Sequence, residues 1–199
     1  MDMNYTHLAL VIDRSGSMSG SEEDVIGGIN TLLQEQKKLK DKLTVSLVQL
    51  DNEYEVNYDF EDIQKIGEFR NFKPRGGTAL YDVVARLINE TGTRLSNTPE
   101  SLRPAKVLFV VYTDGGENAS RETTKLRLDE MIKHQETKYN WDFMFMAADL
   151  SVQESVRNYG QLTNNSYSYA GPKGQTQDMY KNLSGKLANY RCPAGWRWR

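Results

Sequence analysis

The chain alternates between continuous apolar runs and segments in which apolar residues recur every three or four positions. Residues 8–12 and 107–111 are apolar throughout, which is typical of parallel strands that are covered on both faces. Residues 24–40 instead show apolar positions at helical spacing, so an amphipathic helix is predicted there. The chain therefore combines buried strands with surface helices.

The same patterns predict the order of elements along the chain. Strands are expected at residues 8–12, 44–50, 53–60, 106–112, 143–147 and 166–169, and helices at 24–40, 62–69, 78–95, 123–134, 152–159 and 175–190. Only a short turn at Asp51 and Asn52 separates the second and third strands, so these two are expected to form an antiparallel hairpin. Strands that alternate with helices predict an α/β fold with a doubly wound sheet.

The composition fits one globular domain with a single core. The chain has 199 residues, of which 38% are hydrophobic and 26% charged, which excludes a disordered chain. No apolar run approaches the roughly 20 residues that a transmembrane helix needs. The domain is predicted to span residues 1–190, followed by a tail at 191–199 in which Trp196 and Trp198 lie among arginines. Its tryptophans and arginines could stack on bases or contact a membrane surface, but the tail is too short to bind alone, so a docking or packing extension is the favoured interpretation.

Charge and cysteine content narrow the classes of function. The 25 Lys and Arg residues against 27 Asp and Glu residues give a net charge of −2, which disfavours a nucleic-acid backbone as the ligand. Cys192 is the single cysteine, so an internal disulfide and a cysteine-based zinc site are both excluded. The first residues lack the basic and apolar segments of a signal peptide, so a cytoplasmic location is expected.

Oxygen-bearing side chains lie in three segments at one edge of the predicted sheet, two directly after strands and one at the start of a helix. They lie in the motifs Asp-Arg-Ser-Gly-Ser, Gly-Gly-Thr and Thr-Asp-Gly-Gly, and the candidate metal ligands are Asp13, Ser15, Ser17, Thr78 and Asp114. Ligands bind at this edge of open α/β sheets. Oxygen donors without Cys or His point to Mg²⁺ or Mn²⁺. With so few carboxylates the ion stays incompletely neutralised, so an Asp or Glu of a partner protein could complete its coordination.

These three motifs resemble the metal-ion-dependent adhesion site (MIDAS) of the von Willebrand factor type A (VWA) domain, in order and approximate spacing. The resemblance covers residues 6–190. It implies a Rossmann-like, mostly parallel sheet with one antiparallel edge strand and helices on both faces, in agreement with the hairpin prediction. It also implies that Ser15, Ser17 and Thr78 supply hydroxyl ligands, and that Asp13 and Asp114 hold the metal directly or through water.

Simpler interpretations exist for the same residues. The first motif could be only an Asx turn, Thr78 could be only a helix N-cap, and Asp114 could lie in an ordinary turn. Asp82 and Glu117 are secondary candidates whose simpler interpretation is a solvated carboxylate. His7 and His134 are predicted to be structural, since neither has a matched partner in the sequence.

The leading functional hypothesis is a non-catalytic, metal-dependent protein-binding module. The resemblance suggests a role in a multiprotein assembly built around an ATPase, in bacteria or their phages. One alternative is a Mg²⁺-dependent phosphoryl-transfer enzyme, and another is a component of a ribonucleoprotein assembly. A serine hydrolase is disfavoured because a G-x-S-x-G motif placed at residues 16–20 would have Met18 as its nucleophile. No Walker-type phosphate loop is present either.

Overall fold

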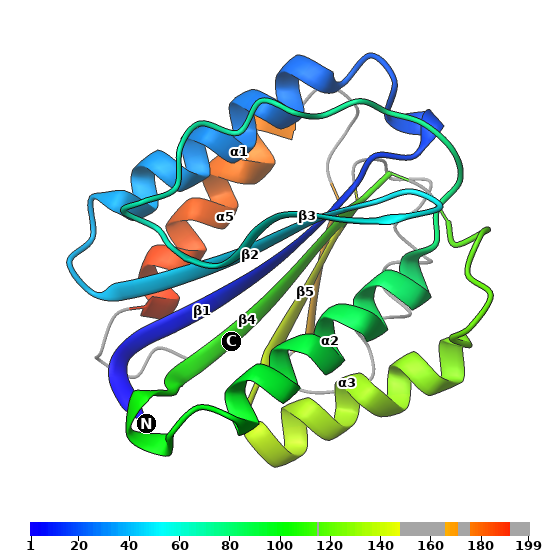
Figure 1. The fold of residues 1–199 in the computed structure, drawn as a ribbon. Helices are drawn as coiled ribbons and strands as arrows, with labels where there is room; N and C mark the ends of the chain where they lie inside the picture. Colours follow the sequence, from blue (N-terminus) through cyan, green and yellow to red (C-terminus); the bar gives the residue numbers. More distant parts are fainter. Residues whose placement is uncertain (115, 148–165, 171–175, 192–199) are drawn as a thin grey trace.

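A six-stranded, mostly parallel sheet forms the centre of the described structure (Figure 1). The computed structural model describes residues 1–114, 116–147, 166–170 and 176–191. The strands are β1 (Asp2–Asp13), β2 (Lys42–Leu50), β3 (Tyr54–Asp62), β4 (Pro104–Thr113), β5 (Asp142–Ala147) and β6 (Ser166–Ala170), in the spatial order β3-β2-β1-β4-β5-β6. Only the edge strand β3 pairs antiparallel, with β2. The predicted doubly wound sheet with one antiparallel edge strand is therefore confirmed.

Helices cover both faces of this sheet (Figure 1). Helices α1 (Glu22–Lys37) and α5 (Thr176–Arg191) pack on one face, and α2 (Leu80–Ser96) and α3 (Lys125–Tyr139) on the other. Asn140 follows α3 with a left-handed backbone and closes its last turn. No helix among the described residues is long and apolar enough to cross a membrane.

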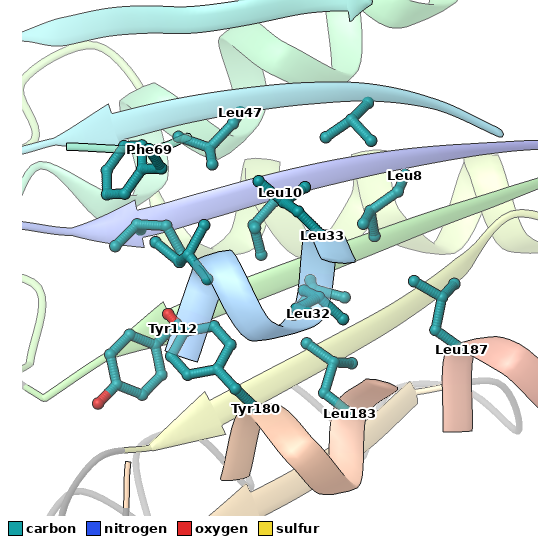
Figure 2. Packing of buried hydrophobic residues seen from close by; sticks show 14 of the residues in the cluster. Leu8, Leu10, Leu32, Leu33, Leu47, Phe69, Tyr112, Tyr180, Leu183 and Leu187 are labelled. Carbon is teal, nitrogen blue, oxygen red and sulfur yellow. The ribbon is translucent and has the colours of Figure 1, made fainter. Parts of the chain in front are cut away.

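Strand β1 shows why the central runs are apolar at every position. Leu8, Leu10 and Ile12 belong to the core cluster beneath α1 and α5, whereas Ala9 and Val11 belong to the cluster beneath α2 and α3. Figure 2 shows the first cluster, where Leu32 and Leu33 of α1 and Leu183 and Leu187 of α5 meet the sheet. Since successive residues of a strand point to opposite faces, a strand covered on both sides needs apolar residues throughout.

The helix predicted at residues 62–69 does not form. Residues 63–65 make a turn, and the chain then runs in an irregular conformation alongside α1 (Figure 1). The side chain of Asn30 on α1 accepts a hydrogen bond from Phe69 N and donates one to Phe69 O, both at 2.8 Å. Lys37 Nζ donates to Ile66 O at 2.5 Å. Because α1 satisfies these backbone groups, the buried Ile63, Ile66 and Phe69 reach the core without a helix.

The last helix includes Arg191, which the predicted domain boundary assigns to the tail. Its buried guanidinium donates to Asp41 Oδ2 at 2.6 Å, to Asp41 O at 2.7 Å and to Gln36 O at 2.9 Å. These contacts fix the end of α5 to the end of α1 and to the loop that follows it. The predicted helix at 152–159, Cys192 and the rest of the tail lie outside the described residues.

Helices α1 and α5 approach closely at Gly28. A Cβ placed on Gly28 would lie 2.2 Å from Cδ2 of the fully buried Tyr180, so the tyrosine ring occupies the space of a missing side chain. The ring also packs at 5.5 Å from Tyr112, the penultimate residue of β4. Gly28 therefore sets how deeply α5 sits against α1.

We predict that Gly28→Ala destabilises the fold by about 1–3 kcal/mol, because overpacking outweighs the roughly 1 kcal/mol that alanine gains over glycine in a helix. Gly185→Ala is the matched control, since Gly185 lies in α5 with no atom within 4 Å of its added Cβ. The control should gain about 0.5–1 kcal/mol. Urea unfolding measures both changes, and equal stabilisation of the two variants would contradict the close packing of Tyr180.

Candidate metal centre

Asp13 ends β1 and has no exposed surface. Its Oδ1 accepts a hydrogen bond from Ser15 N at 2.7 Å, and its Oδ2 accepts one from Thr113 Oγ1 at 2.6 Å. Burial raises the pKa of Asp13 to about 6, although the hydrogen bonds from Thr113 and Ser15 oppose this rise. The carboxylate therefore orients the first loop (residues 13–17) and joins it to the end of β4. The Asx turn of the simpler interpretation is present within this arrangement.

Ser15, Ser17 and Asp114 form a continuous line of oxygen atoms. Ser15 Oγ lies 3.0 Å from Ser17 Oγ, and Ser17 Oγ donates to Asp114 Oδ1 at 2.7 Å. Ser17 belongs to the short 3-10 helix η1 (Gly16–Met18). These contacts cross from the first loop to the third loop (residues 113–123, of which 115 lies outside the described residues). The structure thus brings together four of the five predicted ligand residues.

The second loop (residues 75–78) carries Thr78 to the same edge of the sheet. Gly16 N donates to Gly76 O at 3.1 Å, which joins the second loop to the first. Thr78 N donates to Asn118 Oδ1 at 2.9 Å, and Thr78 O accepts from Asn118 N at 3.1 Å, which joins it to the third. Gly76 has a φ of 68°, and a Cβ there would lie 2.2 Å from Asn52 Oδ1, so this turn requires glycine. All three predicted segments therefore meet.

Thr78 is not the N-cap of α2, contrary to the simpler interpretation. The N-cap position is Ala79, which makes no side-chain cap bond. The third loop satisfies the start of the helix instead: Tyr81 N donates to Glu117 Oε2 at 3.0 Å, and Asp82 N donates to Ser120 Oγ at 3.2 Å. The side chain of Thr78 is therefore not used as a helix cap.

Asp82 and Glu117 are not simple solvated carboxylates either. Asp82 accepts hydrogen bonds from the backbone N–H groups of residues 121–123, and Glu117 accepts them from Ala119 and Ser120. Both carboxylates therefore fold the third loop against the start of α2. Glu117 lies directly after the third motif, but its described contacts are with loop and helix N–H groups and with the Ser120 hydroxyl, which donates to Glu117 Oε2 at 2.7 Å.

Comparison with known proteins identifies this architecture. No family model matches the sequence, and no curated protein matches it. Solved structures do match: the vWF domain of the type V pili tip protein Mfa5 from Porphyromonas gingivalis has a TM-score of 0.64 and is 12% identical, over 96% of this chain and 97% of that one. The chain has the von Willebrand factor type A fold.

Two further matches extend the comparison. The von Willebrand factor type A protein from Catenulispora acidiphila is 14% identical with a TM-score of 0.60, over 91% of this chain and 42% of that one. The pilus adhesin SpaC from Lactobacillus rhamnosus GG is 15% identical with a TM-score of 0.61, over 93% of this chain and 30% of that one. The chain thus spans less than half of these two structures. The resemblance noted from the motifs is confirmed for the VWA fold.

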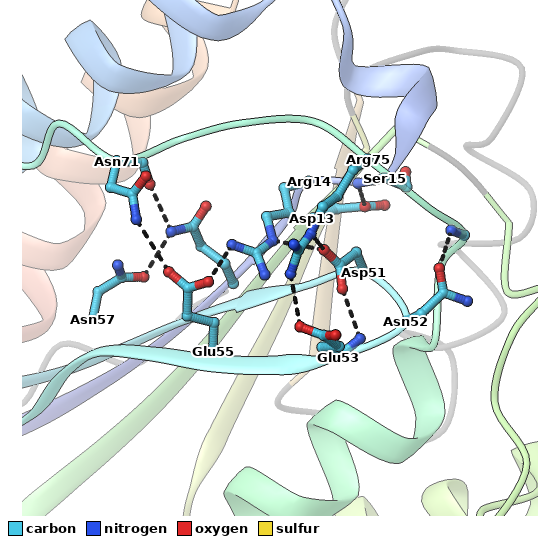
Figure 3. Close-up of polar contacts among 12 residues, drawn as sticks. Asp13, Arg14, Ser15, Asp51, Asn52, Glu53, Glu55, Asn57, Asn71 and Arg75 are labelled. Atoms are coloured by element: carbon cyan, nitrogen blue, oxygen red, sulfur yellow. Dashed lines mark hydrogen bonds and ion pairs between the residues drawn. The ribbon is translucent and has the colours of Figure 1, made fainter.

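Beside the three loops of the candidate metal centre lies an ion network that the sequence motifs do not reveal (Figure 3). Arg14, between Asp13 and Ser15, donates from Nε to Asp51 Oδ2 at 2.9 Å and from Nη1 to Glu55 Oε2 at 2.6 Å. Arg75 of the second loop donates to the same Asp51 Oδ2 at 2.7 Å. Asp51 therefore binds the first and second loops to the end of β2.

This network makes Asp51 a central anchor of the site. Burial would raise the pKa of its carboxyl, but hydrogen bonds from Arg75, Glu53 N and Arg14 outweigh burial and hold the pKa below its ordinary value. Arg75 N also donates to Arg14 O at 2.7 Å, so the two loops are joined through backbone as well as side chains. The sequence motif shows Asp51 only as a turn residue, because its partners lie 24 and 37 positions away.

Two of the oxygen separations, which are hydrogen-bond lengths in this structure, are also compatible with neighbouring ligands of a hard divalent cation. An octahedron with Mg–O distances of about 2.0–2.1 Å has edges of about 2.9 Å, and the Ser15–Ser17 and Ser17–Asp114 oxygen separations of 3.0 and 2.7 Å are close to that length. Within the described ranges, no three His, Cys, Asp or Glu side chains gather in a way that could hold a metal. Hydroxyl oxygens would therefore have to supply part of the coordination, which suits Mg²⁺ or Mn²⁺ better than zinc.

We predict that Asp51→Asn destabilises the protein by about 3 kcal/mol, because it leaves the buried Arg14 short of a counter-charge. Asp59→Asn is the control: Asp59 pairs with Arg94 at 2.7 Å, but both side chains are exposed, so its loss should cost less than about 1 kcal/mol. Urea unfolding of both variants tests the difference. If Asp51→Asn and Asp59→Asn lower the free energy of unfolding equally, Asp51 does not anchor the loops.

The raised pKa of Asp13 predicts a pH dependence of stability. The folded chain holds this proton with a pKa of about 6, above the roughly 3.9 of an unfolded aspartate. The contribution of Asp13 to metal-free stability is therefore present at low pH and is lost as the pH rises through 6. Relative to Asp13→Asn, the wild type should lose up to about 3 kcal/mol between pH 4 and pH 7.5 in chelator. A pH-independent difference in denaturation midpoint would refute this prediction.

Proposed function

We propose that the chain is a non-catalytic binding module that holds Mg²⁺ or Mn²⁺ and uses it to bind an acidic residue of a protein partner. One observation carries the proposal: the oxygens of Ser15, Ser17 and Asp114, from two separate loops, lie at the mutual distances expected of neighbouring metal ligands. The second loop, which carries Thr78, is hydrogen-bonded to both of these loops.

The predicted site residues would have two roles, as ligands of the ion and as support for those ligands. The hydroxyls of Ser15, Ser17 and Thr78 and the carboxylate of Asp114 would hold the ion. Asp13 would support them, since its two oxygens already orient Ser15 and Thr113. When bound, the ion supplies a positive centre that accepts a carboxylate oxygen of the partner, because hydroxyl ligands add no negative charge.

The fold comparisons support a binding role in general terms. SpaC is described as a pilus adhesin and Mfa5 as a pili tip protein. Neither description bears on the partner of this chain, and the cytoplasmic location expected from the sequence stays a prediction.

The metal site is tested by calorimetric titration of Mg²⁺ and Mn²⁺ into chelator-treated protein. Wild type should show one saturable site, and Ser17→Ala should weaken it at least tenfold, because Ser17 contacts both Ser15 and Asp114. Ser19→Ala is the matched control, since Ser19 is an exposed serine two residues further along the same segment. Binding that is unaffected by Ser17→Ala, or lost equally in Ser19→Ala, would contradict the ligand assignment.

The partner chemistry is tested by selecting peptides from a random displayed library on the Mn²⁺-loaded protein. We expect every enriched peptide to contain Asp or Glu, and its capture to be lost in chelator and in Asp114→Ala. Enriched peptides without an acidic residue, or capture that persists in chelator, would overturn the metal-bridge mechanism even if the ion itself binds.

A further inference from the structure

A cleft lies at the opposite end of the sheet from the candidate metal centre. It has a volume of about 290 Å³ and lies where the C-terminal ends of α2 and α3 meet the first residues of β4. In Figure 1 these two helix ends lie side by side, next to the N-terminus of the chain. Leu95, Pro104 and Val107 contribute apolar walls. No residue of the three metal-site loops lines it.

Gly92 leaves open space in the cleft because it has no side chain. Gly92 lies on α2 opposite Trp141, and even an added Cβ would remain 4.0 Å from the tryptophan Cη2. Trp141 is held in place by stacking on Phe109 of β4, with ring centroids 5.4 Å apart and planes at 13°. Tyr139 packs against the same indole, with a centroid separation of 6.5 Å. Trp141, which is 5% exposed, and the exposed Tyr139 thus form an aromatic wall of the cleft beside an open position.

The polar groups of the cleft favour a carboxylate. Arg103 is fixed by two neutral acceptors, since Nε donates to Thr98 O at 2.7 Å and Nη2 to Ser96 O at 3.1 Å. A guanidinium has five N–H donors, so donors remain for a ligand. His134 is a second basic side chain in the lining, and no described lining residue is acidic. Arg103 forms no ion pair with any carboxylate in the described parts of the chain, so its charge is uncompensated there.

The rim indicates that the ligand belongs to a protein. Met1 and Tyr139 border the cleft, and Leu102 precedes Arg103; all three expose more than half of their surface. Apolar residues exposed around a concave site are typical of protein interaction surfaces. The cleft lies at the lower limit of the roughly 300–1,000 Å³ of small-molecule sites, which suits one large side chain.

We propose that this cleft is a second docking site, in which an aromatic side chain of a partner protein packs against Trp141 and an adjacent carboxylate of that partner pairs with Arg103. The site needs no metal ion. It is independent of the proposed metal centre, because the two share no residue and lie at opposite ends of β4.

The test uses the peptide acetyl-Ala-Phe-Asp-Ala-amide, titrated into the full chain in chelator so that metal coordination cannot contribute. Nuclear magnetic resonance should show saturable shifts of the Trp141 indole and the Gly92 amide. A matched peptide with Asn in place of Asp should bind about tenfold more weakly, because it cannot pair with Arg103. Arg103→Gln should make the two peptides bind equally, since glutamine lacks the positive charge.

Gly92→Leu provides the blocking variant. Leucine fills the space opposite Trp141, and replacing a glycine inside α2 should also favour the helix, so the variant is expected to fold. Urea unfolding checks this, and peptide binding should fall at least tenfold. The absence of saturable shifts in wild type, or equal binding by folded Gly92→Leu, would overturn the site. Octanoate binding more tightly than the peptide at the same residues would overturn the protein ligand in favour of a small amphipathic acid.

Discussion

The buried carboxylate of Asp13 is the interaction on which the candidate metal centre depends. It sits where β1 leaves the sheet, and it receives the backbone N–H of Ser15 on one oxygen and the hydroxyl of Thr113 on the other. A buried carboxylate is costly unless donors satisfy it, so its two donors must stay in place. That requirement fixes the direction of the first loop and ties it to the neighbouring strand β4. The line of oxygens from Ser15 to Asp114 follows from this arrangement.

Asp51 plays the corresponding part for the second loop. Its buried carboxylate pairs with Arg14 of the first loop and with Arg75 of the second loop, so one residue at the end of β2 joins both loops (Figure 3). Breaking a buried charged cluster of this kind costs far more than breaking a surface pair. Two buried carboxylates therefore hold the loops of the candidate metal centre, Asp13 at the end of β1 and Asp51 at the end of β2.

The sequence predicts those parts of the fold that short-range patterns determine. Residues 8–12 and 107–111 are apolar throughout because helices cover both faces of β1 and β4, and a continuous run is the direct sign of this. The helix predicted at 62–69 is wrong because side chains of α1, more than twenty residues earlier, satisfy the backbone of that segment. No local pattern encodes such a partner.

In the candidate site too, local sequence motifs predict some features, whereas contacts between distant residues determine others. The motifs correctly place Asp13, Ser15, Ser17, Thr78 and Asp114 at one edge of the sheet, because parallel strands end together there. The sequence motifs do not identify Asn118 and Asp51, because Asn118 contacts Thr78 at 40 positions' distance and Asp51 contacts Arg75 and Arg14 at 24 and 37. Thr78 looks like an ordinary helix cap in the sequence, and only the contacts of Glu117 and Ser120 reveal that the third loop performs that task.

Strand β4 runs from the cleft at Pro104 to the loop of the candidate metal centre that follows Thr113, and its ten residues span about 30 Å. Such a strand in the middle of a sheet is a stiff spacer. A partner with an acidic residue and an aromatic anchor separated by that span would engage both ends at once, and its second contact would form at the high effective concentration of a tethered group. A partner too short to reach would gain nothing from the second site. The length of β4 would then determine which partner proteins can bind at both sites and therefore bind tightly.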